Sequence, residues 1–183
     1  MAKSAPSYPW YDTVIGDEIQ QGDILEGCPV FVPPSNLAET GPEATTFKWV
    51  ERDVIIMSQS CDLVKERAKV EEVLLCAVWK RSEIKSGELA TPQGMEKARK
   101  GLLPPFHVLA ECSLSSFTRE VQVVDFRRVY TLPLEFIRKL AVSKDRIRLL
   151  PPYREHLAQA FARFFMRVGL PVDIPPFVKS GSS

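Results

Sequence analysis

The sequence predicts an α+β protein: a small, mainly antiparallel β-barrel with short inserted helices and an amphipathic helix near its C-terminus. Short apolar or alternating segments recur at a spacing of roughly 10–15 residues, which is typical of antiparallel strands. Short helical patterns appear only in the second half. One long apolar stripe at helical spacing follows Pro151-Pro152, and we expect that helix to close the barrel or pack on a second element.

The composition is that of an ordinary globular protein. The 183 residues suffice for one domain with a sizeable core, and 45% of them are hydrophobic and 26% charged. The net charge is +1, but residues 1–90 hold 9 Lys and Arg against 15 Asp and Glu, and residues 91–183 hold 15 against 8. If the halves form separate surfaces, the second suits an anion or an acidic protein. If the halves interleave in one fold, the charges mix.

The sequence favours a cytoplasmic protein without a membrane partner. Residues 1–20 lack the apolar core of a signal peptide, and no apolar run approaches the roughly 18 residues of a transmembrane helix. Four cysteines without a secretory context are expected to be reduced thiols.

The organising stretch is Asp53–Leu63. Val54–Met57 is apolar and short, as in a strand buried on both faces, and it changes at once to Ser58, Gln59, Ser60, Cys61 and Asp62. Such an end is suited either to chemistry or to a tight turn.

The remaining elements follow from local patterns. Strands are expected at 22–32 (with a bulge or edge position at Gly27 and Pro29), 46–51, 73–79, 106–111, 119–125 and 146–150, with a turn at Arg52-Asp53 and a loop over 35–45. Helices are expected from the Thr91-Pro92 cap to Gly101, although Gly94 weakens this one, and at 134–140 and 153–168. The domain prediction is an N-terminal arm (1–20, of which 1–12 lack secondary structure), a barrel domain (21–150), a helix and extended tail packed on the barrel (151–178) and a disordered tail (179–183).

The cysteines predict no metal site and no cofactor. They are isolated from one another, whereas structural zinc sites draw ligands in close pairs. Cys61 stands at the polar end of a strand, and His107 is its candidate base, so a Cys61–His107 thiol pair is one hypothesis. The alternative is a turn built from Ser60, Cys61 and Asp62 side chains.

Two further patterns point to partners. Basic residues cluster around 97–100, 127–128 and 138–148 near aromatic residues, so RNA contact is one hypothesis and a solvated surface the other. The closing helix carries Phe161, Phe164 and Phe165 on its apolar stripe, which predicts either core packing or a partner-binding surface. No Gly-rich phosphate loop or zinc-protease motif occurs.

The chain resembles the MazF/PemK toxin family in the order Gly22-Asp23-Ile24, a loop, then Val54-Ile-Ile-Met-Ser58. The resemblance covers about 40 residues. The resemblance implies an SH3-like (PemK/MazF-like) β-barrel and, for members, metal-independent endoribonuclease activity. Arg52 stands where the family has its catalytic arginine, and Asp53 replaces the proline that follows it. Arg52 and Ser58 are therefore the residues that the resemblance marks as catalytic.

Three functions remain open from the sequence. The first is a non-enzymatic regulatory or adaptor protein that binds another protein, in a setting (toxin–antitoxin or phage defence) that the resemblance alone implies. The second is a MazF-like ribonuclease using Arg52 and Ser58, and the third a thiol enzyme using Cys61. A homo-oligomer is compatible with each.

Overall fold

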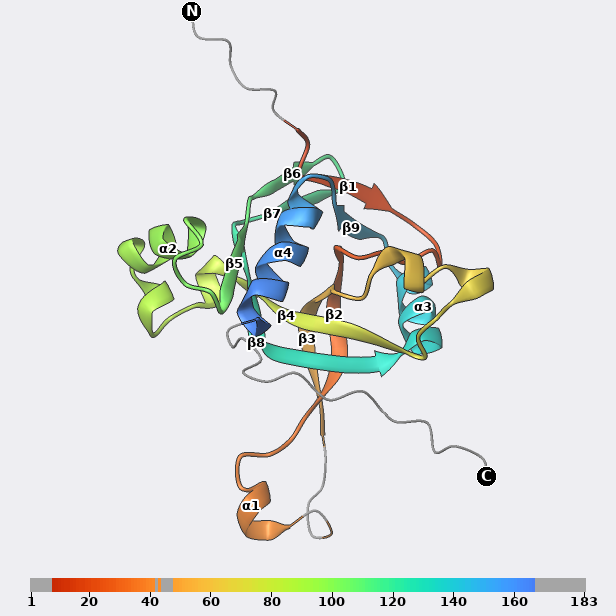
Figure 1. Ribbon diagram of the computed structural model, residues 1–183, viewed down its shortest axis with the longest axis horizontal. Helices are drawn as coiled ribbons and strands as arrows, with labels where there is room; N and C mark the ends of the chain where they lie inside the picture. Colours follow the sequence, from red (N-terminus) through yellow and green to blue (C-terminus); the bar gives the residue numbers. More distant parts are fainter. Residues whose placement is uncertain (1–7, 42, 44–47, 167–183) are drawn as a thin grey trace, which may run out of the picture.

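The computed structural model describes residues 8–41, 43 and 48–166 (Figure 1). It is an α+β structure built on one mostly antiparallel sheet with few, short helices. The strands are β1 (Tyr11–Val14), β2 (Asp23–Val32), β3 (Lys48–Ile56), β4 (Glu72–Lys80), β5 (Phe106–Leu109), β6 (Cys112–Leu114), β7 (Phe117–Arg119), β8 (Gln122–Pro133) and β9 (Arg146–Leu149). The α-helices are α1 (Leu37–Thr40), α2 (Pro92–Arg99), α3 (Leu134–Ser143) and α4 (Tyr153–Phe165).

Seven strands form the main sheet in the order β1-β9-β2-β3-β4-β8-β5, and β6 and β7 form a separate pair. Among the described residues no pairing joins the end strands β1 and β5, so the architecture shown is an antiparallel sheet, and the SH3-like barrel stays a prediction. The two halves of the sequence interleave, since β2 pairs with β9 and β4 with β8. Their opposite charges therefore mix across one fold.

The apolar run at the end of β3 is buried on both faces, as predicted. Ile55 belongs to a core cluster that α4 covers through Leu157, while Val54 and Ile56 belong to a second cluster that α3 covers through Ile137. The sheet thus lies between two helical layers, and each fully buried aliphatic side chain contributes roughly 1.5–3 kcal/mol.

Several local predictions are confirmed. β2 carries a register shift between Leu25 and Cys28, at the predicted bulge, with Gly27 at φ 58. Thr91 caps α2 by accepting the N–H of Gly94, and Gly101 follows α2 at φ 71. Gly94 is required within α2, because a Cβ there would lie 1.8 Å from the Glu88 carbonyl oxygen. Only glycine permits that close approach.

Four predictions need correction. The expected turn at Arg52-Asp53 is wrong, because β3 continues through both residues and pairs with β2 from Lys48 to Arg52. Residues 11–14 of the expected arm form strand β1, which pairs with β9. The loop at 35–45 contains the one-turn helix α1. The strand expected at 119–125 is divided into β7 and the longer β8.

The length of β8 is linked to a bulge. Cys76 pairs with Val129 and Ala77 with Asp125, so Phe126, Arg127 and Arg128 stand out of the β4 ladder. Phe126 is fully buried in the core cluster under α4. A bulge of this kind redirects side chains, and here it sends Phe126 inward.

Beyond the residues of β3 that pair with β4, β2 and β3 continue as a paired arm with α1 at its tip, which projects away from the sheet (Figure 1). The 17 C-terminal residues 167–183, including the predicted helix end, Gly169 and the extended tail, lie outside the described residues.

Candidate functional site

The strongest candidate site is a cleft at the root of the arm, where β3 and β4 separate. The two strands pair only from Val54–Ala77 to Ile56–Leu75, whereas β3 continues toward Lys48 with β2 and β4 toward Lys80 with β8. The divergence opens a cavity of about 360 Å³. Its walls are formed by Gly27, Glu51, Arg52, Asp53, Val78, Trp79, Lys80 and Glu83.

Arg52 is the central side chain of this cleft. Its guanidinium lies over the Trp79 ring, 5.0 Å from the ring centroid, which is a cation–π geometry. Its Nε is buried and has no hydrogen-bond partner among the described residues. Such a donor is costly to leave unsatisfied, so a ligand oxygen placed here would be stabilised.

The carboxylate of Asp53 faces the same space from the next position of β3. Its Oδ1 accepts the N–H of Gly27 at 3.0 Å, and its Oδ2 lies 3.9 Å from Lys80 Nζ. The β2 bulge at Gly27 therefore positions an acid beside the arginine. Glu51 and Glu83 supply two more carboxylates to the same cavity.

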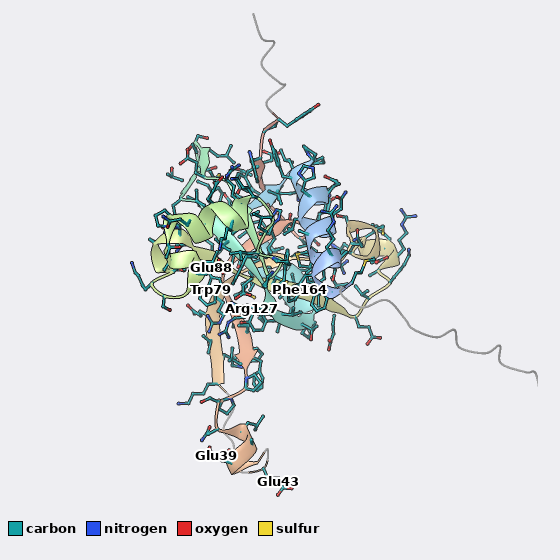
Figure 2. The ribbon with its side chains drawn as sticks, turned by 60° about the vertical axis from the view of Figure 1, so that its left-hand side comes forward. Glu39, Glu43, Trp79, Glu88, Arg127 and Phe164 are labelled. Atoms are coloured by element: carbon teal, nitrogen blue, oxygen red, sulfur yellow. The ribbon has the colours of Figure 1, made fainter. Side chains whose placement is uncertain are left out.

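A second cavity, of about 430 Å³, adjoins the first and shares Trp79 and Glu83 with it. Arg127, from the β8 bulge, lies over the Phe106 ring at 4.5 Å and donates from Nε and one terminal nitrogen to Asp125, both at 2.9 Å. These bonds raise the pKa of Arg127, against the opposing effect of burial. Figure 2 shows Trp79, Glu88 and Arg127 close together above the arm.

The arrangement combines flat cations stacked on aromatic rings with several carboxylates. It is suited to holding a chain by stacking and ion pairs. In residues 8–41, 43 and 48–166 no group of His, Cys, Asp and Glu is arranged to hold a metal ion. The chemistry available to the cleft residues themselves is binding and proton transfer by carboxylates.

Ser58, paired with Arg52 in the sequence hypothesis, does not line the cleft. Its Oγ accepts the N–H of Leu74 at 2.8 Å, on the far side of the three β3–β4 pairs from Arg52. Ser60 Oγ likewise accepts the N–H of Gln21 at 3.1 Å. These hydroxyls satisfy backbone donors where β3 ends, which is a turn-building role.

Cys61 lies in a 3₁₀ turn, Ser60–Asp62, and its thiol is exposed, with Sγ 3.6 Å from Asp62 Oδ1. It lines the largest of the described cavities, about 670 Å³, together with Arg138 and Arg154. No histidine lines that cavity. His107 instead lines a different cavity with His156, so the structure does not bring the proposed thiol and base together.

The phenylalanines of α4 divide between core and surface. Phe161 and Phe164 pack against the core cluster, with ring centroids 5.4 and 6.0 Å from that of Phe126. Phe165 is 58% exposed. The predicted partner-binding stripe is therefore largely core, and only its end faces solvent.

Sequence reasoning missed the exposed aromatic pair of the arm. Phe31 and Trp49 are cross-strand partners, and their rings meet edge to face at 5.6 Å. Trp49 is 61% exposed and Phe31 40%. The available signal was Trp49 in an alternating strand that directly follows a loop, since a large aromatic residue there has no predicted neighbour to cover it.

No protein-family model matches the chain, and no curated protein sequence matches it significantly. None of the helices in the described part of the chain is long and apolar enough to cross a membrane.

Proposed function

We propose that the protein is a non-enzymatic regulatory or adaptor module that binds another protein through the β2–β3 arm. The observation that carries this proposal is the exposed Phe31–Trp49 pair on an arm that projects from the sheet (Figure 1). Aromatic residues are enriched among the few side chains that dominate binding energy at interfaces.

The acidic charge of the arm indicates the kind of surface that its partner presents. Residues 29–51 hold Glu39, Glu43 and Glu51 against a single basic residue, Lys48. Glu39 and Glu43 lie at the tip, far from the sheet (Figure 2). The matching surface is a protein with an apolar pocket for Trp49 and a basic rim. The toxin–antitoxin or phage-defence setting of this partnership rests on the family resemblance alone.

The backbone of the arm supports the same proposal. β3 pairs with β2 along one edge from Lys48, while its pairing with β4 begins only at Val54. The outer edge of residues 48–53 therefore offers backbone groups to an added strand, and strand addition supplies affinity while a side-chain pocket supplies specificity.

The test is quantitative capture from the native host with tagged protein. Three baits are compared: wild type, Trp49→Ala and Phe165→Ala, which removes an exposed aromatic residue outside the arm. A partner retained by wild type and Phe165→Ala is then purified, and its affinity is measured by calorimetry. We expect Trp49→Ala to weaken it about tenfold or more. Equal affinity for all three would contradict docking on the arm.

A ribonuclease is the second candidate. It is favoured by the position of Arg52 in the wall of a cleft that is also lined by three carboxylates. In this proposal a cleft carboxylate takes the proton of the 2′-hydroxyl as its oxygen attacks the phosphorus, and Arg52 stabilises the phosphoryl charge. The bond from phosphorus to the 5′-oxygen then breaks, giving a cyclic 2′,3′-phosphate, and solvent water protonates the leaving 5′-oxygen. Expression should arrest growth, and Arg52→Ala should relieve the arrest while Ser58→Ala, outside the cleft, should not. Cleavage of single-stranded RNA in EDTA is the direct assay. No cleavage by wild type would remove this candidate.

The SH3-like barrel belongs to the same set of proposals. Its support is the family-like order in which Gly22-Asp23-Ile24 opens β2 and the apolar Val54–Met57 run ends the β3 region. An experimental structure in which β1 and β5 come together to close the sheet would establish it.

A further inference from the structure

A groove separate from the cleft lies where β5 runs between α2 and α4 (Figure 1). The end of α2, strand β5 and one face of α4 enclose about 260 Å³. Its polar lining is Arg99 and Lys100 after the helical turns of α2, His107 of β5, and His156, Gln159 and Arg163 of α4.

The groove contains basic groups only. Every ionisable side chain that lines it is Arg, Lys or His, whereas the three larger cavities carry three carboxylates each. Three basic residues from the second half of the sequence, Arg99, Lys100 and Arg163, thus meet in one groove without an acidic neighbour in its lining.

The helical spacing aligns the α4 contribution. His156, Gln159 and Arg163 recur at i, i+3 and i+7, so they share one face of the helix beside the core stripe. In the described part of the chain Arg163 forms no ion pair, and its guanidinium remains available for a ligand.

The two α2 cations differ in how firmly they are held. Arg99 donates from Nε and from one terminal nitrogen to the two carboxylate oxygens of Glu96, both at 2.7 Å, whereas Lys100 Nζ makes a single exposed contact of 3.2 Å with the same carboxylate. A single exposed pair contributes little stability, so Lys100 is free to turn toward a ligand. Neither cation is required to cap α2, since the N–H groups of residues 100–102 already bond the last carbonyls of that helix.

We propose that this groove binds a phosphate group. A phosphate presents up to two negative charges and three strong acceptor oxygens, so it suits convergent donors from Arg163, Lys100 and Gln159 better than a two-oxygen carboxylate does. The phosphate belongs either to a small phosphomonoester, which presents all three oxygens and up to two charges, or to the backbone of a single-stranded nucleic acid, whose phosphodiester keeps one charge and two free oxygens.

His107 provides a built-in reporter. Burial, followed by the nearby charge of His156, lowers the pKa of His107 to about 4, so its imidazole is neutral at pH 7. The groups that face it from α2 and α4 are Arg99, Lys100, His156 and Arg163, without a carboxylate in the lining. A bound phosphate adds the missing negative charge and should raise the pKa of His107.

The experiment titrates inorganic phosphate, AMP and a ten-nucleotide RNA lacking terminal phosphates into the full chain, with NMR detection of the two imidazoles. Arg163→Gln is compared with Arg67→Gln, which removes the same charge from the exposed 3₁₀ turn Lys65–Arg67 on the other side of the molecule (Figure 1). We expect Arg163→Gln to lower phosphate affinity about tenfold and Arg67→Gln to leave it unchanged.

The outcomes separate the two sources. If AMP binds at least as tightly as the RNA and both depend on Arg163, the site takes a small phosphomonoester. If the RNA binds at least tenfold more tightly and depends on Arg163, it takes a nucleic-acid backbone. The proposal is overturned if phosphate leaves both imidazole resonances unmoved, or if the two variants weaken binding equally.

Discussion

The two ends of the β2–β3 strand pair differ sharply in burial. At the sheet end, Asp23 and Ile24 of β2 and Ile55 of β3 are fully buried between two helical layers. At the arm end, Phe31 and Trp49 of the same strands are exposed. The same two strands run through both ends and pair on either side of the bulge at Gly27, so the difference in burial arises from what lies beside and above them.

Along this one pair of strands, the residues that stabilise the fold are separate from those that are accessible to a partner. The sheet end has strand neighbours on both sides, β9 and β4, and apolar cover on both faces. The arm end has only its own partner strand. Segments with few packed neighbours contribute least to global stability and are free to serve binding. The following predictions test this division.

The largest expected effect is at the sheet end of β2. Asp23 is fully buried and accepts hydrogen bonds from Arg146 Nε at 2.8 Å and Arg148 Nε at 2.5 Å. Asp23→Ala leaves these arginines without their carboxylate and should lower the free energy of unfolding by about 3–5 kcal/mol. Urea denaturation measures it, with Glu39→Ala at the arm tip as the control expected to change little. A loss as small as that of the control would show that the buried pair is not structural.

The apolar centre of β3 comes next. Ile55→Ala removes a fully buried side chain from the cluster beneath α4 and should cost about 2–5 kcal/mol. The same denaturation assay applies, and Ile55→Val should cost about 0.5–1.5 kcal/mol. If both variants unfold like wild type, the sheet end is not the stabilising half.

A smaller, pH-dependent effect belongs to the sheet as well. The folded pKa of His107 is about 4, below its ordinary 6.5, so the unfolded chain binds more protons between these values. Its contribution to stability is therefore present above pH 6.5 and lost as pH falls toward 4. His107→Phe should flatten this part of the unfolding free energy against pH. An unchanged slope would mean that His107 is equally accessible to protons in the folded state.

The smallest effect is expected in the arm. Trp49→Ala should change the free energy of unfolding by only about 0.5 kcal/mol or less, because the side chain is 61% exposed and remote from the core clusters. Its effect should appear instead in partner affinity. Thermal and urea unfolding of this variant beside Ile55→Ala gives the sharpest comparison, and a stability loss similar to that of Ile55→Ala would contradict it.

Local patterns predicted many of the elements. The apolar run at Val54–Met57, the bulge at Gly27 and the caps of α2 at Thr91 and Gly101 all depend on neighbours a few residues away. Backbone conformation and the alternation of side chains are decided at that range. The same local logic failed at Arg52-Asp53, where pairing with β2 carried the strand through an expected turn.

The candidate site depended on tertiary structure. Arg52 was singled out from the sequence, but its neighbour Trp79 lies on another strand, and the cleft exists because the β3–β4 ladder stops after three pairs. Phe161 and Phe164 became core because the β8 bulge places Phe126 beneath them. The sequence by itself determined most of the segments that become strands and helices and which residues are apolar enough for a core. Pairing between distant segments decided the strand register, the point where β3 and β4 separate, and which aromatic rings are buried. These features depend on contacts between residues far apart in the sequence, which local patterns do not specify.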